Sequence, residues 1–190
     1  MNVLSDTALF LGAIPYPDWL RRKMRETKGV CMSSVEERLH FVHALAEQNV
    51  RENTGSPFGA AVFHSGTHAL AGVGVNQVVQ AGQSFAHAEM LALANAHERL
   101  QLTDLKDYEL VSSCEPCVMC TGGFLWSKVR TLVYGEMGTT ARSIGFDEGD
   151  KPANWVEQLR QRGLQILGPF PSEQGKRPFA LYKASQGKIY

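Results

Sequence analysis

Two short segments, His87-Ala88-Glu89 and Pro116-Cys117-Val118-Met119-Cys120, decide how this chain is interpreted. Together they supply one imidazole and two thiols, which are good zinc ligands, and one carboxylate that need not be a ligand. A structural zinc site closes its tetrahedron with four protein ligands, whereas a hydrolytic site keeps one position open and places a general acid/base beside it. The pattern therefore predicts a catalytic zinc site with the ligands His87, Cys117 and Cys120. Glu89 is then expected to be its proton carrier.

The spacing of these residues is compatible with two helix N-termini. Pro116 follows a short strand predicted over residues 108–112, and it can occupy the first turn of a helix because its missing N–H costs nothing there. Cys117 and Cys120 are three residues apart, so they share one face of that turn, where the positive end of the helix dipole favours the thiolate. His87 likewise opens an Ala-rich stretch that predicts a helix to about residue 100.

A third cysteine leaves an alternative open. Cys114 extends the pattern to Cys114-x-x-Cys117-x-x-Cys120, which with His87 could close a structural zinc site or hold an iron–sulfur cluster. Against both alternatives, Cys114 precedes the proline turn, and a closed site leaves Glu89 without a role. We therefore interpret Cys114 as a small buried hydrophobic residue.

These residues resemble the signature of the zinc-dependent cytidine and nucleobase deaminase superfamily, in which H-x-E is followed by P-C-x-x-C. The resemblance spans about residues 55–149 and is strongest with the bacterial guanine deaminases. Three flanking segments carry that narrower likeness: residues 56–62, Val75-Asn76 and residues 144–148. The resemblance implies hydrolytic deamination of a free purine base, guanine to xanthine plus ammonia. It also implies a three-layer α/β/α fold with a mixed central sheet.

The same resemblance implies roles for several polar side chains. Glu89 would accept a proton from the attacking water and deliver it to a ring nitrogen. An acidic residue of the Gly-Phe-Asp-Glu element would carry a proton to the leaving amine; the matching residues are Asp147 and Glu148, and we favour Glu148, with an ordinary surface turn as the alternative. Asn76 is expected to bind the edge of the base, because an amide offers a donor and an acceptor together, although it could be a simple turn residue.

Aromatic residues are candidates for the walls of a pocket for a planar heterocycle. Phe58, Trp126 and Phe146 could hold the ring, and each could equally be a core residue. In the resembled bacterial enzymes, C-terminal segments are exchanged between subunits, so that each tail closes the partner's site. Tyr190 is therefore expected to contact the substrate within a homodimer, with a frayed terminus as the alternative.

Length and composition are compatible with one domain and two appendages. The chain has 190 residues, of which 44% are hydrophobic, and it contains no internal repeat and no apolar run of membrane-spanning length. We expect an N-terminal extension over 1–32, packed through residues 8–14, a zinc-dependent deaminase domain over 33–170 and a tail over 171–190. Of the four cysteines, two or three cluster around the expected metal and only Cys31 is distant, so they do not form a disulfide framework, which favours the cytoplasm. The lack of a membrane-spanning run predicts no membrane partner.

The charge of the chain bears on the substrate. Lys plus Arg equals Asp plus Glu at 19 each, so no global field attracts a polyanion such as tRNA. The densest basic segment, residues 21–25 with Lys28, is interpreted as a solvated face. A small, uncharged nucleobase is favoured. The alternatives are guanosine or another nucleoside, cytosine, an amino-triazine, a pterin, adenosine in tRNA, or a non-catalytic zinc domain that binds a partner.

Periodicity predicts the remaining elements. Ser34-Val35-Glu36-Glu37 is typical of a helix start, and a helix is predicted to about residue 50. Two strands, 60–63 and 69–75, are predicted around a turn at 65–66, and a further strand is predicted at 129–134. A helix at 155–162, a short strand at 164–167 and a helical tail beyond 171 are predicted to follow. The strand–helix–strand succession predicts parallel pairing at one end of the sheet.

Overall fold

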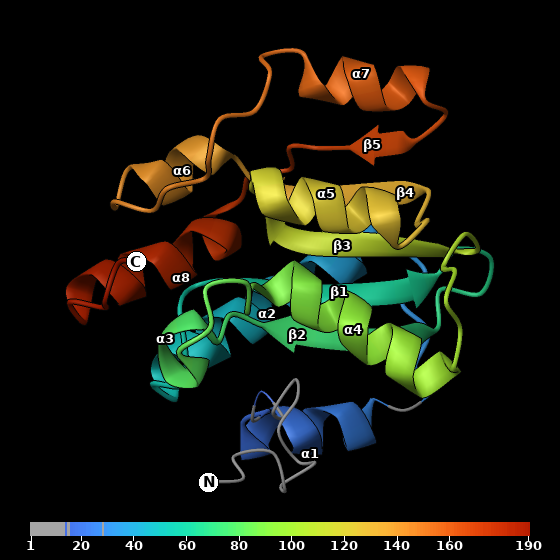
Figure 1. Cartoon of the computed structure of the whole chain (residues 1–190). Helices are drawn as coiled ribbons and strands as arrows, with labels where there is room; N and C mark the ends of the chain where they lie inside the picture. The colour runs from blue at the N-terminus through green and yellow to red at the C-terminus, as the bar shows by residue number, and fades with distance from the viewer. Residues whose placement is uncertain (1–13, 15, 28) are drawn as a thin grey trace, which may run out of the picture.

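The computed structural model describes residues 14, 16–27 and 29–190, and a five-stranded sheet runs through its centre (Figure 1). The strands are β1 (Gly59–His64), β2 (Leu70–Val75), β3 (Tyr108–Cys114), β4 (Thr131–Glu136) and β5 (Gln165–Leu167). Their order is β2-β1-β3-β4-β5; β1 is antiparallel to β2 and β3, whereas β3, β4 and β5 are parallel. The mixed sheet of an α/β fold is therefore confirmed.

Helices cover both faces of this sheet. Those of one face are α4 (Ala88–Leu100), α5 (Val118–Trp126) and, toward β5, α7 (Trp155–Gln161). Those of the other face are α1 (Asp18–Glu26), α2 (Val35–Arg51) and α8 (Glu173–Ala184). The short α3 (Val78–Ala81) and α6 (Gly138–Arg142) lie in connections. No helix in the described part of the chain is long and apolar enough to cross a membrane.

The alternation of strand residues explains the two layers. In β1, Ala60 and Val62 pack toward α4 and α5, while Ala61 and Phe63 pack toward α1 and α2. Successive side chains of a strand point to opposite faces, so every central strand feeds two separate apolar cores. The predicted three-layer arrangement follows from this pattern.

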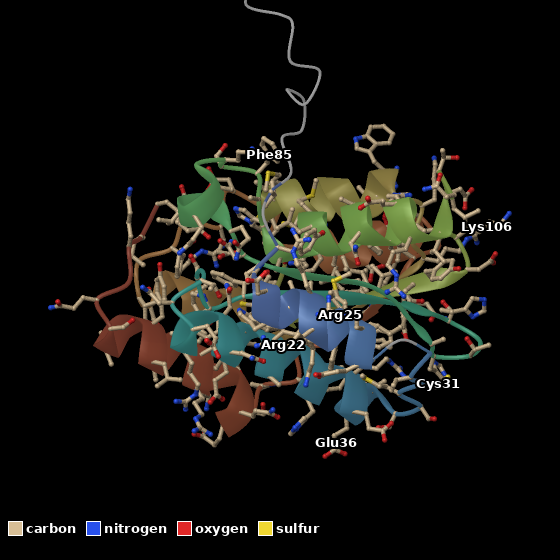
Figure 2. The ribbon with its side chains drawn as sticks, turned by 90° about the horizontal axis from the view of Figure 1, so that it is seen from below. Arg22, Arg25, Cys31, Glu36, Phe85 and Lys106 are labelled. Carbon is tan, nitrogen blue, oxygen red and sulfur yellow. The ribbon has the colours of Figure 1, made fainter. Side chains whose placement is uncertain are left out.

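The N-terminal helix belongs to one of these cores. Trp19 and Leu20 of α1 are buried in the same cluster as α2 and the sheet, so residues 18–26 pack against the core. Arg22 and Arg25 lie exposed on the outer side of α1, as Figure 2 shows, which fits a solvated face. Lys28 and all but the last residue of the 8–14 segment lie outside the described residues.

Several predicted element boundaries differ by one or two residues from those observed, and two of these differences have a local cause. β4 begins at Thr131 rather than at residue 129, because Lys128 adopts a left-handed conformation with φ of 67° and prolongs the preceding turn. α5 begins at Val118 rather than at Pro116. Cys117 has extended backbone, with ψ of 173°, and is the N-cap of the helix, so the proline precedes the helix instead of opening it.

Two glycines of β2 allow α4 to lie close to the sheet. A Cβ atom on Gly72 would stand 2.6 Å from the carbonyl oxygen of Ala92, and one on Gly74 would overlap the carbonyl oxygen of Ala88. Glycine is needed where another backbone approaches a strand this closely. The first turn of α4 therefore rests directly on the last residues of β2.

Candidate active site

His87, Cys117 and Cys120 come together where α4 and α5 begin. The Nδ1 atom of His87 lies 3.5 Å from Sγ of Cys117 and 3.6 Å from Sγ of Cys120. A tetrahedral zinc ion, with Zn–S of about 2.3 Å and Zn–N of about 2.05 Å, separates its nitrogen and sulfur ligands by about 3.6 Å. The three side chains thus have the spacing of zinc ligands. Within the described residues they form the only such group of His, Cys and acidic side chains.

Cys114 is not a member of this group. It is 1% exposed at the end of β3, in an apolar cluster with Ala141, Phe146 and Phe179. Its thiol donates a hydrogen bond to the carbonyl oxygen of Met137 at 3.6 Å, and burial raises the pKa of the thiol far above its usual range. A closed site with three cysteines is therefore not formed.

The start of α5 stabilises a thiolate at Cys117. As the N-cap, its Sγ accepts a hydrogen bond from the backbone N–H of Cys120 at 3.4 Å. The hydrogen bond with the Cys120 side chain, together with that to His87, outweighs the opposing effect of burial and lowers the pKa of Cys117 to about 4. Thiolate is the form of cysteine that binds a metal.

Glu89 lies in the first turn of α4, next to the sulfur ligands. Its carboxylate accepts hydrogen bonds from Oγ of Ser112 at 3.1 Å and from Sγ of Cys120 at 3.4 Å. The side chain is buried; burial first, and the charge of Cys117 second, raise its pKa above the ordinary value. A carboxyl group with raised proton affinity beside a metal site is suited to accept a proton and deliver it again.

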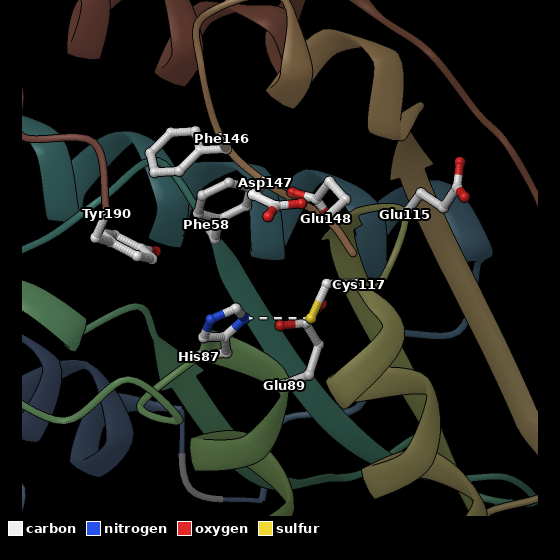
Figure 3. A pocket seen from close by; sticks show the side chains of 9 residues that line it. All are labelled: Phe58, His87, Glu89, Glu115, Cys117, Phe146, Asp147, Glu148 and Tyr190. Carbon is white, nitrogen blue, oxygen red and sulfur yellow. Dashed lines mark hydrogen bonds between the residues drawn. The ribbon is translucent and has the colours of Figure 1, made fainter. Parts of the chain in front are cut away.

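A pocket opens above these groups (Figure 3). Six of the residues predicted to bind or process the substrate line it: Phe58, Glu89, Phe146, Asp147, Glu148 and Tyr190. The rings of Phe58 and Phe146 meet edge to face with centroids 5.0 Å apart, and Tyr190 meets Phe146 in the same way at 5.3 Å. The pocket therefore has aromatic walls on one side and the metal-binding group on the other.

The two neighbouring acidic residues of this pocket differ in their environment. Glu148 is 6% exposed; burial, and then the charges of Glu89 and Cys117, raise its pKa to about 8. Asp147 is exposed, and its carboxylate accepts a hydrogen bond from the backbone N–H of Gly149 at 2.8 Å. The structure thus favours Glu148 as the residue that acts within the pocket and Asp147 as the residue that shapes the turn.

Asn76 is buried beside the pocket. Its Oδ1 accepts a hydrogen bond from the N–H of Val78 at 3.1 Å, and its carbonyl oxygen accepts one from Asn49 at 3.0 Å. Burial raises the pKa of Tyr190 above its usual value, while hydrogen bonds to Ser56 and Asn76 oppose that rise. The C-terminal residue therefore reaches the amide group that was predicted to bind a base.

The tail reaches the pocket within one chain. The hydroxyl of Tyr182 on α8 donates a hydrogen bond to the carbonyl oxygen of Lys188 at 2.6 Å, and the ring of Tyr190 then stands 6.2 Å from that of His87. The terminus is not frayed. Exchange of tails between subunits stays a prediction.

Trp126, which was predicted to form part of the pocket wall, lies outside the pocket. It ends α5, is 82% exposed and does not line the pocket. It follows Cys120 by six residues, which places it about 9 Å along the helix axis from the ligand. No role was predicted for Ser112 or for Glu115. Glu115 lines the pocket, and its position directly before the Pro-Cys motif could have indicated this.

Comparison with known proteins places this site in context. The family model for the cytidine and deoxycytidylate deaminase zinc-binding region matches residues 32–136. A guanine deaminase from Bacillus subtilis is 36% identical over 115 residues, which are 57% of this chain and 72% of the relative. A chloroplast tRNA(adenine(34)) deaminase from Arabidopsis thaliana is 31% identical over 132 residues, which are 61% of this chain but only 10% of the relative.

Two solved structures are similar to this chain over most of its length. A guanine deaminase from Nitrosomonas europaea superposes with a TM-score of 0.83 at 35% identity, covering 90% of this chain and 95% of that one. A structure of NE0047 in complex with 2,6-diaminopurine gives a TM-score of 0.85 at 36% identity, covering 93% and 94%. The similarity therefore extends well beyond the zinc-binding segments.

Proposed function

The chain belongs to the cytidine and deoxycytidylate deaminase zinc-binding family, and from this premise we propose that it deaminates a free purine base, converting guanine to xanthine and ammonia. One observation carries the proposal: three metal ligands at zinc spacing, two of which line the pocket, lie beside a buried carboxylate that is not needed as a ligand. The Bacillus subtilis and Nitrosomonas europaea proteins that the chain resembles are guanine deaminases, which supports guanine among the possible bases.

The metal ligands and Glu89 divide the first chemical steps among them. His87, Cys117 and Cys120 would hold zinc, which would supply a nucleophile by lowering the pKa of a water molecule toward neutrality. Glu89 accepts the proton of the attacking water and delivers it to the ring nitrogen beside the amine-bearing carbon. Its hydrogen bond from Ser112 on β3 orients the carboxylate during both transfers.

Glu148 serves the departure of ammonia. With its pKa raised to about 8, this carboxyl group holds a proton at neutral pH and can give it to the leaving amine, while the hydroxyl group added to the ring carbon loses its proton to Glu89 as the carbonyl forms. Phe58 and Phe146 hold the planar ring, while Asn76 and Tyr190 contact its far edge. Each of these roles requires only side chains that line or adjoin the pocket.

The lining of the pocket supports a small, phosphate-free substrate. Among the described residues, four acidic side chains and no Lys or Arg line it: Glu89, Glu115, Asp147 and Glu148. A phosphate group would therefore find no cationic side chain in this lining, whereas nucleic-acid enzymes neutralise phosphates with basic side chains. A tail that covers the pocket also favours a free base, because a ribose or a polynucleotide would have to displace Tyr190.

The substrate is tested by ammonia release from a panel at matched concentration. The panel contains guanine, adenine, cytosine, guanosine, cytidine, an amino-triazine, a pterin and tRNA. Guanine is expected to give the highest kcat/KM. Preference for guanosine or activity confined to tRNA would refute the proposed substrate. Zinc-loaded, folded protein that releases no ammonia from any compound would support the interaction-domain alternative instead.

We also propose the homodimer with exchanged tails, which can be tested by complementation. Glu89→Gln subunits with intact tails are mixed with subunits that lack residues 187–190 but keep Glu89. If tails are exchanged, a hybrid dimer contains one complete site and activity returns. If each tail serves its own chain, no site in the mixture is complete and activity stays low.

A further inference from the structure

Lys151 is a buried cation at the edge of the pocket. Its side chain is 6% exposed, and its ammonium group donates hydrogen bonds to Oε1 of Glu115, at 2.6 Å, and to the carbonyl oxygen of Pro116. The same nitrogen lies 4.6 Å from the ring centroid of Trp155. A lysine seldom gives up its hydration unless specific partners replace the lost water, and here three partners do so.

The partners of Lys151 lie directly before the metal-binding turn. Glu115 and Pro116 lead into Cys117, the N-cap of α5. The second carboxylate oxygen of Glu115 accepts a hydrogen bond from the N–H of Gly138 at 3.1 Å, and the backbone N–H of Glu115 donates to the carbonyl oxygen of Glu136 at 2.8 Å. The ammonium group thus completes the set of bonds that fixes this entry segment against β4 and α6.

Lys151 also belongs to the segment that carries Glu148. The carbonyl oxygen of Glu148 accepts a hydrogen bond from the N–H of Val118 at 3.0 Å. Gly149, with φ of 67°, packs so closely on the Val118 side chain that an added Cβ would overlap it. Segment 146–151 is therefore attached to the start of α5 at two places, one through its backbone and one through the ammonium group of Lys151.

We infer that Lys151 is a positioning residue, which holds the metal-ligand segment 115–117 and the acidic segment 146–151 at a fixed separation. The separation between the Glu148 carboxylate and the thiol of Cys117 depends on that attachment. Lys151 does not line the pocket and touches no reacting atom, so it acts through Glu115 and through the segment it shares with Glu148. Its effect on turnover rests on the proposed function, whereas its effect on metal retention does not.

The experiment compares Lys151→Met, which keeps the aliphatic stem, with Lys151→Arg, which keeps the charge. The matched control is Lys176→Met, because Lys176 forms an exposed ion pair with Glu173 at 3.0 Å on α8. Three quantities are measured on zinc-loaded protein: kcat and KM with guanine, the rate of zinc release to a chromophoric chelator, and the melting temperature.

Lys151→Met is expected to lower kcat about 10-fold or more, with KM changing less than about 3-fold, because misplaced groups cost transition-state stabilisation rather than ground-state binding. Zinc release should be several-fold faster. Lys151→Arg should recover most of both losses, and Lys176→Met should match the wild type. If Lys151→Met does not fold, Glu115→Gln is expected to show the same changes in kcat and zinc release.

A different pattern overturns the inference. If Lys151→Met melts at a lower temperature while kcat and zinc release stay at wild-type values, Lys151 only stabilises the fold. If Lys151→Arg restores neither kcat nor zinc retention, a role for the charge of Lys151 is also refuted. Failure of the wild type to deaminate guanine would reject the proposed substrate, and zinc release would still decide whether Lys151 positions the metal-binding segment.

Discussion

Two regions of the active site are held in place by different means. The metal ligands and Glu89 stand in the first turns of α4 and α5, whose N-termini meet at the sheet. Glu148 and Tyr190, in contrast, are carried by the segment 146–151 and by the C-terminal tail. The first region is fixed by local helix geometry, and the second by contacts between residues far apart in the sequence. We expect the first to be required for any chemistry and the second to set its rate and selectivity.

The contacts of each region illustrate the difference. Cys117, the N-cap of α5, accepts the N–H of Cys120, which lies three residues further along the same helix. The outer region depends on single tertiary contacts, such as the hydrogen bond from Lys151 to Glu115 and the edge-to-face contact of Tyr190 with Phe146. Loss of one helix-borne group should therefore abolish function, whereas loss of one outer contact should weaken it.

The largest effect is expected for Cys117→Ser, compared with Cys114→Ser. Serine is a poor zinc ligand, so the first variant should lose zinc and all measurable activity, whereas the second should keep about one zinc per chain. Metal content is measured by elemental analysis after gel filtration. Equal loss of zinc in both variants would show that Cys114 belongs to the metal-binding region after all.

The next effect is expected for Glu89→Gln, which preserves size and removes the proton carrier. The variant should retain zinc, because Glu89 is not needed as a ligand, and kcat should fall on the order of 10²-fold or more. Stopped assays of ammonia release with zinc content measured on the same sample test this. A zinc-loaded variant with wild-type turnover would remove Glu89 from the essential region.

A smaller effect is expected for Glu148→Gln in the outer region. If this residue supplies the proton of the leaving amine, kcat should fall about 10- to 100-fold, with less change in KM, because the contact matters mainly in the transition state. Steady-state kinetics with guanine provide the measurement. An increase in KM at constant kcat would instead assign Glu148 to binding.

The smallest effect is expected for Tyr190→Phe. The ring that packs on Phe146 remains, and the hydroxyl group that is hydrogen-bonded with Ser56 and Asn76 is lost, at a net cost of about 1 kcal/mol, so KM should rise about 5-fold. Trp126→Ala serves as the control and should stay within about 2-fold of the wild type, since Trp126 is outside the pocket. If Tyr190→Phe is silent while Trp126→Ala impairs activity, the assignment of the outer region is reversed.

This contrast also explains what the sequence could predict. His87, Glu89, Cys117 and Cys120 were predictable because each pair lies within one helical turn, where spacing in the chain determines spacing in space. Ser112 and Lys151 were missed, since their contacts cross between elements and leave no local pattern. The role of Asn76 could not be decided from the sequence, because asparagine is common both in turns and in sites that bind a base through its amide group.

The fold was predicted to a similar extent and for similar reasons. The order of helices and strands and the parallel pairing of β3 with β4 follow from periodicity and from the strand–helix–strand succession. The short helices α3 and α6 have too few residues to show a period. The start of β4 was predicted two residues too early, because nothing in the sequence around Lys128 predicts its left-handed backbone conformation.

Gly74 shows how far the demands of catalysis reach into the scaffold. Ala88, whose carbonyl oxygen lies against Gly74, is flanked by His87 and Glu89, so a single methyl group on the strand would displace the imidazole and the carboxylate together. A displacement of about 1 Å can cost on the order of 10²-fold in rate. A genetic screen for inactive variants would therefore recover substitutions at Gly74, although this residue has no side chain and does not line the pocket.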